Sequence, residues 1–185
     1  SGVGASFQNG IADKRIRDLQ DNGRTMLLHA ERNWPGAINT HLWPYALQMA
    51  SDVYNSTPRI EEEASPVENF AGFKMRPLLS RFHHFGCPVC VLHRKLQSGQ
   101  KGRKWENRAR VGIYLGHSTQ HAKSIALVLS LETGLVSPQF HCSFDDLFET
   151  TEPSQRHLLP DSIWQERAHF VKVPRSNKAS VRDEL

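Results

Sequence analysis

The fold of this chain is decided by residues 7–30, FQNGIADKRIRDLQDNGRTMLLHA, which have the pattern of an amphipathic helix. Apolar or small residues recur there at spacings of three and four, and such spacings place side chains on one helix face. The face consists of Ala12, Ile16, Leu19, Gly23, Met26 and Ala30. Because Asn9-Gly10 is a turn signal, the sequence predicts a helix from about Ile11 to Ala30.

A second row of residues borders this face and is polar. It consists of Asp13, Arg17, Gln20 and Arg24, again at helical spacings. A carboxylate in the first turn, followed four residues later by an arginine, stabilises a helix locally. The pattern alone therefore indicates a solvated face with one ion pair, and it predicts that Asp13 is exposed.

Composition narrows the class of protein. The 185 residues suffice for one large or two small domains, and a net charge of +4 permits a polyanionic partner without requiring one. No apolar run approaches the length of a membrane span, and no charged-then-apolar leader is visible. Three cysteines without a leader indicate a reducing, intracellular compartment. Since no Met stands at position 1, we expect the chain to begin within a longer protein.

Two further helices are marked by their start signals. Asn39 or Thr40 can cap a helix that runs to about Asn55. Ser65-Pro66-Val67-Glu68 combines a capping box with proline at the first helical position, and Ala71-Gly72 ends that short helix.

The period changes near residue 78, where short apolar or alternating segments replace the helical pattern. These segments are residues 85–92, 110–115, 124–131 and 135–144. Turn-rich pieces separate them, which predicts a small antiparallel barrel or sandwich distinct from the helices. Thr133-Gly134 predicts a tight hairpin, and Pro138 predicts an edge strand or bulge.

The sequence motif around Asp13 resembles a known signature. Gln8-Asn9-Gly10-Ile11-Ala12-Asp13 is similar to the copia-type retrotransposon integrase signature, in which Gln-Asn-Gly, an apolar residue and Ala precede a catalytic Glu. Further strings resemble the same polyproteins in order and spacing: WPGAINTHLWPYAL, SPVENFAG, FGCPV, GIYLG, GLVSPQFH and FDD. The resemblance covers roughly residues 2–150.

This resemblance implies an α+β fold with two units and a tail. Residues 1–77 would be the helical C-terminal part of a ribonuclease-H-like integrase core. Residues 78–150 would form an SH3-like antiparallel β-barrel, and residues 151–185 a linker and a disordered tail.

The resemblance also implies chemistry for a complete parent protein, which would act on DNA in the nucleus. Such integrases hold two Mg²⁺ ions with three carboxylates and carry out in-line phosphoryl transfer. Asp13 would be the last catalytic metal ligand, although its side chain is one methylene shorter than the family's Glu. The other two ligands would lie upstream, so we expect this chain alone to be inactive. The alternative is a non-catalytic module, a relic of a decayed element, that binds nucleic acid or another part of the polyprotein.

A basic segment around Trp105 is the main candidate for DNA contact. Its cations are Lys101, Arg103, Lys104, Arg108 and Arg110. Positive charge beside an aromatic ring suits a nucleic-acid backbone, although a charged surface loop between strands has the same composition. Arg17 and Arg24 form a second candidate patch beside Asp13.

Two clusters have simpler interpretations. His83, His84, Cys87 and Cys90 have zinc-ligand types, but in a strand they would alternate between faces and could not converge. The sequence therefore predicts no zinc, only reduced thiols. Asp145-Asp146 could bind a metal, yet its place at a strand end favours a turn cap.

Overall fold

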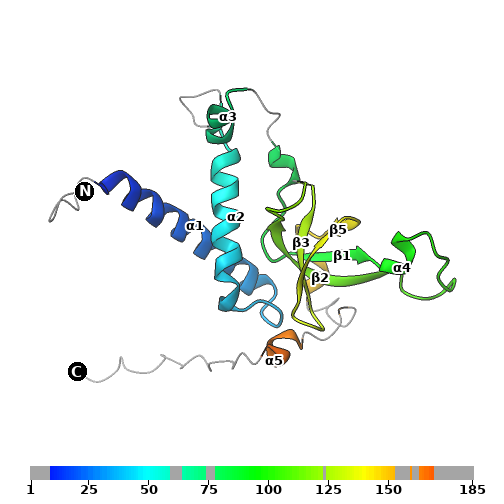
Figure 1. The fold of residues 1–185 in the computed structure, drawn as a ribbon. Helices are drawn as coiled ribbons and strands as arrows, with labels where there is room; N and C mark the ends of the chain where they lie inside the picture. Colours follow the sequence, from blue (N-terminus) through cyan, green and yellow to red (C-terminus); the bar gives the residue numbers. More distant parts are fainter. Residues whose placement is uncertain are drawn as a thin grey trace, which may run out of the picture.

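The computed structural model describes residues 9–58, 64–73, 78–122, 124–152, 159 and 163–168. Helices come first and a five-stranded antiparallel sheet follows, so the predicted α+β class is confirmed (Figure 1). The helices are α1 (Gly10–Asn33), α2 (Trp43–Ser56), α3 (Pro66–Ala71), α4 (Arg94–Gln97) and α5 (Trp164–Arg167). The strands are β1 (Pro88–Leu92), β2 (Ala109–His117), β3 (Ala126–Ser130), β4 (Val136–Gln139) and β5 (Cys142–Phe144).

Helix α1 confirms the predicted helix, but its apolar face is buried along only part of its length. Leu27 and Ala30 are buried near its C-terminal end, whereas Ile11 and Ile16 are 88% and 55% exposed. Between them, Gly23 lets the backbone of α2 come close, because a Cβ at this position would lie 3.2 Å from the Leu47 backbone. The C-terminal half of α1 therefore packs closely on α2, whereas the N-terminal half leaves Ile11 and Ile16 largely exposed.

The predicted helix ends are confirmed by the capping contacts. The Asn39 side chain accepts a hydrogen bond from the His41 backbone N–H at 3.0 Å, which opens the 3₁₀ turn Thr40–Leu42 before α2. At α3, Ser65 and Glu68 form a capping box in which the Ser65 backbone N–H donates to the Glu68 carboxylate at 2.7 Å. Gly72 then ends α3 in the left-handed region, with φ of 74°.

The sheet has the strand order β4-β3-β2-β1-β5, with every pair antiparallel. Pro138 lies on the edge strand β4 and Gly134 turns the β3–β4 hairpin with φ of 73°, as the sequence predicts. Within the described residues, no hydrogen bonds join the two edge strands, so the sheet is not closed into a barrel by hydrogen bonds, and the SH3-like fold stays a prediction. Only Phe140 and His141 connect β4 to β5, so the chain itself brings the two edges within about 10 Å at that end.

The segment 135–144, predicted as one strand, is two. It pairs with β3 as far as Gln139 and then with β1 from Cys142. Its alternation is continuous, so periodicity does not show where the chain changes partner.

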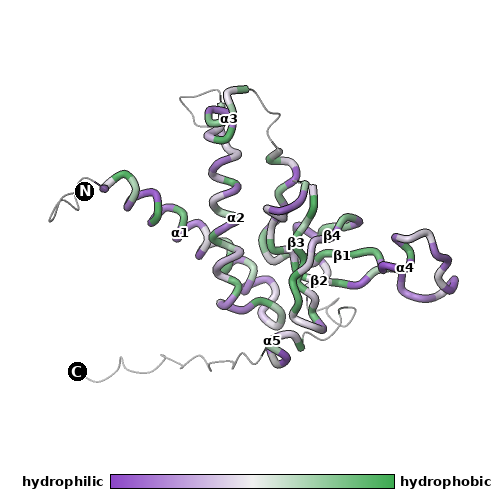
Figure 2. Tube along the Cα trace, in the orientation of Figure 1, coloured by the Kyte–Doolittle hydropathy of each residue, from purple (hydrophilic) through white to green (hydrophobic). Residues whose placement is uncertain are grey.

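The strand-rich unit is confirmed, but its expected separation from the helices is not what the structure shows. One cluster of buried side chains includes Leu27 and Ala30 of α1, Met49 of α2 and Ile113 of β2. The alternation of hydrophobic and hydrophilic segments along α1 and α2 can be followed in Figure 2. The helices and the sheet therefore share a core, and the domain boundaries stay predictions.

Within the described part of the chain, no helix has both the length and the apolar character needed to cross a membrane.

Candidate nucleic-acid interface

Asp13, the predicted metal ligand, lies in the first turn of α1 and is exposed, as its position in the polar row predicts. Its neighbour Arg15 fastens this end of the helix. The Arg15 guanidinium lies 4.0 Å from the centroid of the Tyr54 ring of α2, and 3.8 Å from the Asp18 carboxylate. The role of Asp13 as a ligand stays a prediction.

Arg17 and Arg24 are also exposed on α1. With a rise of about 1.5 Å per residue, Arg17 lies about 6 Å and Arg24 about 16 Å along the axis from Asp13. The three side chains border the side of the helix that faces α2. They form one polar strip, so an extended anion along α1 could contact both arginines.

The basic segment around Trp105 forms a loop between α4 and β2, except for Arg110, which lies in β2 and pairs with Val91. Every residue from Ser98 to Ala109 is exposed, and the Trp105 ring is 91% exposed. The base of the loop is fixed, because the His93 backbone N–H donates to the Arg108 carbonyl at 2.9 Å. The loop is drawn in hydrophilic colours in Figure 2. Lys101, Arg103, Lys104 and Arg108 are therefore all available to a ligand.

The structure does not unite the two basic patches. Figure 1 shows α1 and the loop after α4 on opposite sides of the molecule, with α2 and the sheet between them. Each patch is therefore a separate candidate for contact with nucleic acid.

The candidate zinc cluster is divided, but not by strand alternation, because β1 begins at Pro88 and only Cys90 of the four lies in a strand. Cys87 is buried and Cys90 on β1 is exposed. Burial raises the pKa of the Cys87 thiol far above its usual value, with the charges of Asp146 and Asp145 adding to the shift. Across the described ranges, no three His, Cys, Asp or Glu side chains are placed to hold a metal ion. The absence of zinc stays a prediction.

Asp145 caps the turn that follows β5, which confirms the capping interpretation for this residue, whereas Asp146 contacts the distant His83 and His84. The Asp145 carboxylate accepts hydrogen bonds from the backbone N–H groups of Glu149 and Thr150, at 3.1 and 2.8 Å. The Asp146 carboxylate accepts from the His84 backbone N–H at 2.9 Å and lies 2.9 Å from Nδ1 of His83. Burial raises the pKa of Asp146, but these two hydrogen bonds and the charges of His83 and His84 together outweigh burial, so the pKa lies below its usual value.

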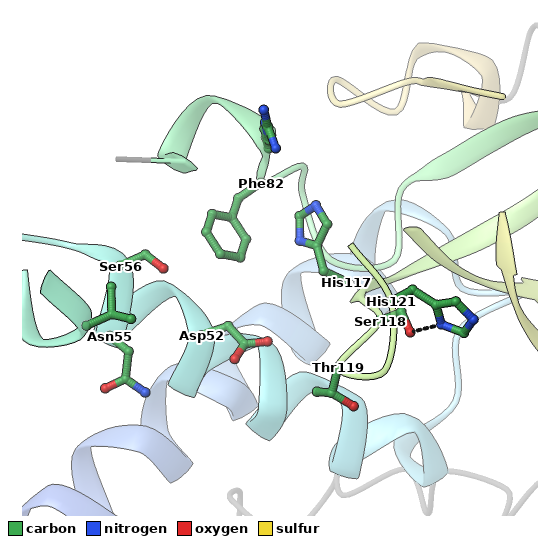
Figure 3. Close-up of a pocket in the computed structure, with 10 residues that line it drawn as sticks. Asp52, Asn55, Ser56, Phe82, His117, Ser118, Thr119 and His121 are labelled. Carbon is green, nitrogen blue, oxygen red and sulfur yellow. Dashed lines mark hydrogen bonds between the residues drawn. The ribbon is translucent and has the colours of Figure 1, made fainter. Parts of the chain in front are cut away.

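Sequence reasoning missed a cleft of about 340 Å³ between α2 and the sheet. Figure 3 shows Phe82 and His117 along one side and Asp52 and Asn55 of α2 along the other. Burial, and then the charge of the neighbouring His83, lower the pKa of His117, which favours its neutral form. The lining residues come from four separate stretches of chain, so no local sequence signal marks the cleft.

The chain is similar to two curated retrotransposon proteins of Arabidopsis thaliana. It is 28% identical over 161 residues to the retrovirus-related Pol polyprotein from transposon RE1, and 25% identical over 139 residues to that from transposon RE2. These alignments cover 86% and 75% of the chain. The chain is thus distantly related to copia-type Pol polyproteins.

The matched segment is only a small part of each related polyprotein. The chain spans only 10% and 9% of the length of the two polyproteins. No family model matches it, and no solved structure matches it. The relation to Pol polyproteins therefore stands on sequence similarity, and the place of the segment within them is a proposal.

Proposed function

We propose that this chain is the part of a retrotransposon Pol polyprotein that joins the C-terminal helices of an integrase core to an SH3-like domain. The observation that carries the proposal is the similarity to Pol polyproteins over 86% of the chain. It is combined with the integrase-like motif at residues 8–13, which leads into α1. In the complete parent, the segment would contribute to DNA integration by metal-dependent phosphoryl transfer.

The surface of the helices supports a role as one part of a larger core. An apolar groove of about 460 Å³ lies between α1 and α2, and Ile16, Leu19 and Leu47 are among its lining residues. Trp43 at its side is 60% exposed. Such a groove is typical of a face that packs against further polypeptide. We propose that the rest of the parent's core covers it.

The donor set limits the chemistry of the chain itself. Two Mg²⁺ ions held for in-line displacement need several carboxylates, and Asp13 is one. Within the described residues it has no pair of carboxylate partners that could complete such a site. Asp13 would supply one oxygen ligand to Mg²⁺ in the parent, and this chain would position it on a helix fixed by Arg15 and Tyr54.

Replacing Asp13 by asparagine should therefore change no reaction of this chain. We expect no Mg²⁺-dependent joining of DNA strands by the unsubstituted 185-residue chain or by its Asp13→Asn variant, measured with labelled oligonucleotides. Binding of duplex DNA should not weaken in Asp13→Asn, because the change removes a negative charge beside Arg17. Strand joining by the chain alone, lost in Asp13→Asn, would overturn this account of an incomplete site.

Duplex binding through the Trp105 loop should be weak and should depend on salt. Neutralising Lys101, Arg103 and Lys104 together to glutamine should reduce the slope of log affinity against log salt by up to about three units. The loss should be similar for unrelated sequences, because phosphate contacts position a protein without specifying bases. Titrations of a labelled duplex at several salt concentrations measure the slope.

The matched control removes three charges elsewhere. Arg32, Arg81 and Arg167 are exposed and lie outside the loop, so their replacement by glutamine gives the same net charge. If both triple variants flatten the slope equally, the effect is one of overall charge and the loop is not the binding surface.

The alternative function is a non-catalytic binding module. Two features favour such a module over catalysis for the chain in isolation. Asp13 is the single carboxylate proposed as a metal ligand, and the basic loop is exposed. The coding sequence upstream discriminates: two acidic residues at strand ends support the integrase parent, and a stop codon supports the relic.

A further inference from the structure

The Trp105 side chain is almost fully exposed and does not contribute to the packing of the fold. Of the four tryptophans, Trp34 and Trp164 are buried at 4% and 2% exposure, whereas Trp105 is 91% exposed. A ring of this size buries 150–250 Å² when it is packed and dominates the energetics of the contacts that it makes. At position 105 the ring contributes almost no burial to the protein, so its apolar area is available to a ligand.

The loop presents this ring in a defined way. The Glu106 backbone N–H donates to the Arg103 carbonyl at 3.3 Å, which forms a turn with Trp105 inside it. At the base, Leu92 pairs with Ala109 in the β1–β2 ladder, and the Gln97 side chain donates to the Leu92 carbonyl at 2.7 Å. The sheet therefore holds the ends of the loop while the ring points away from the core.

One cation, Lys104, lies over the ring, and a second, Arg103, lies beside it in sequence with only an exposed ion pair. The Lys104 ammonium lies 5.5 Å from the centroid of the Trp105 ring, within the range of a cation–π contact. Arg103 lies 3.5 Å from the Glu106 carboxylate, but both side chains are well exposed, at 88% and 59%. An exposed pair of this kind contributes little, so a phosphate can displace the carboxylate.

An exposed aromatic ring among cations matches the chemistry of an unpaired nucleic-acid strand. In intact duplex the faces of the bases are covered by their neighbours, and only edges and phosphates are accessible. In an unpaired strand a base can stack on the indole while the cations contact the flanking phosphates. We propose that the Trp105 loop binds an unpaired nucleic-acid strand by stacking a base on Trp105, and that it prefers such a strand to intact duplex.

This inference rests on the proposed contact with nucleic acid and adds a preference to it. The test compares three labelled DNA ligands of equal length at one salt concentration: a mixed-sequence single strand, its duplex, and a single strand with abasic sites. Trp105→Ala should weaken binding of the normal single strand by at least about fivefold. Binding of the duplex and of the abasic strand should change by less than about twofold.

Two variants act as controls. Trp43→Ala removes another exposed indole, from α2, and should leave all three affinities unchanged. Trp105→Phe keeps an aromatic face and should restore most of the affinity for the normal single strand. A matched RNA strand should show the same dependence on Trp105, since stacking requires only a base.

The outcomes separate the preference from the binding. Equal losses on single strand and duplex in Trp105→Ala, or no loss on either, would overturn base stacking while leaving phosphate contact intact. If the unsubstituted chain binds none of the three ligands, the proposed contact with DNA fails as well. An effect on the abasic strand as large as on the normal strand would show that the ring packs against backbone, and this too would overturn the inference.

Discussion

Replacing Trp164 by alanine should lower the free energy of unfolding by about 3–5 kcal/mol, the range for truncating a large buried aromatic side chain. The Trp164 side chain is buried, and its indole Nε1–H donates to the Ala37 carbonyl at 2.7 Å. Its backbone lies against the β3–β4 turn, since a Cβ at Gly134 would be 3.4 Å from the Trp164 carbonyl oxygen. The residue therefore joins α5, the loop after α1 and the sheet.

Thermal and urea unfolding measure this effect. For a chain of this size we expect the melting temperature to fall by about 6–20 °C. Trp164→Phe keeps most of the apolar area but leaves the Ala37 carbonyl without its donor, so it should cost about 1–3 kcal/mol. Trp105→Ala, at an exposed position, should change the free energy of unfolding by no more than about 0.5 kcal/mol relative to the unsubstituted chain. A Trp164→Ala variant as stable as the parent would show that α5 is not docked.

Local signals in the sequence predicted the elements that are held by local contacts. Ser65 and Glu68 are three residues apart and make a reciprocal cap, so the start of α3 follows from the residues themselves. Pro138 lacks a backbone N–H and is therefore restricted to an edge, which is where β4 lies. In both cases the physical cause acts within a few residues.

Features that depend on distant partners were not predicted. His83 stacks on Phe144 with ring centroids 3.6 Å apart, and it reaches Asp146, 63 residues away. Trp164 lies in a short segment without periodicity, so nothing local indicates that it is buried. Whether β4 meets β5 through hydrogen bonds depends on the curvature of the sheet, and a pattern of alternating residues predicts strands without predicting closure.

The candidate site divides in the same way. The polar row of α1 and the basic loop are continuous in sequence, and their exposure was predicted. Their position on opposite sides of the molecule depends on how α1 and the sheet pack, which no motif specifies. The cleft beside His117 needs residues of α2 and of the turn after β2 together, so only the tertiary structure reveals it.

The packing of α1 on the sheet unit can be tested at Gly86, where we expect alanine to cost about 2–5 kcal/mol. Gly86 has φ of 78°, a conformation that costs other residues about 1–2 kcal/mol. An added Cβ would also lie 2.5 Å from the Cβ of Ala30 and 3.0 Å from Cδ1 of Ile38. Because Ala30 is fully buried in α1, the helix would have to move, at a further cost of about 1–3 kcal/mol.

Gly99 provides a control with the same backbone conformation and no steric clash. Its φ is also 78°, and a Cβ there would meet nothing within 4 Å. Gly99→Ala should therefore show only the conformational cost of about 1–2 kcal/mol, and the excess in Gly86→Ala measures the contact with α1. Ala30→Gly should destabilise the parent but relieve the clash, giving Gly86→Ala/Ala30→Gly a favourable coupling of about 1 kcal/mol or more in urea unfolding. If Gly86→Ala costs no more than Gly99→Ala and shows no coupling to Ala30, then α1 does not pack against the strand-rich unit, and the helices and the sheet are independent units after all.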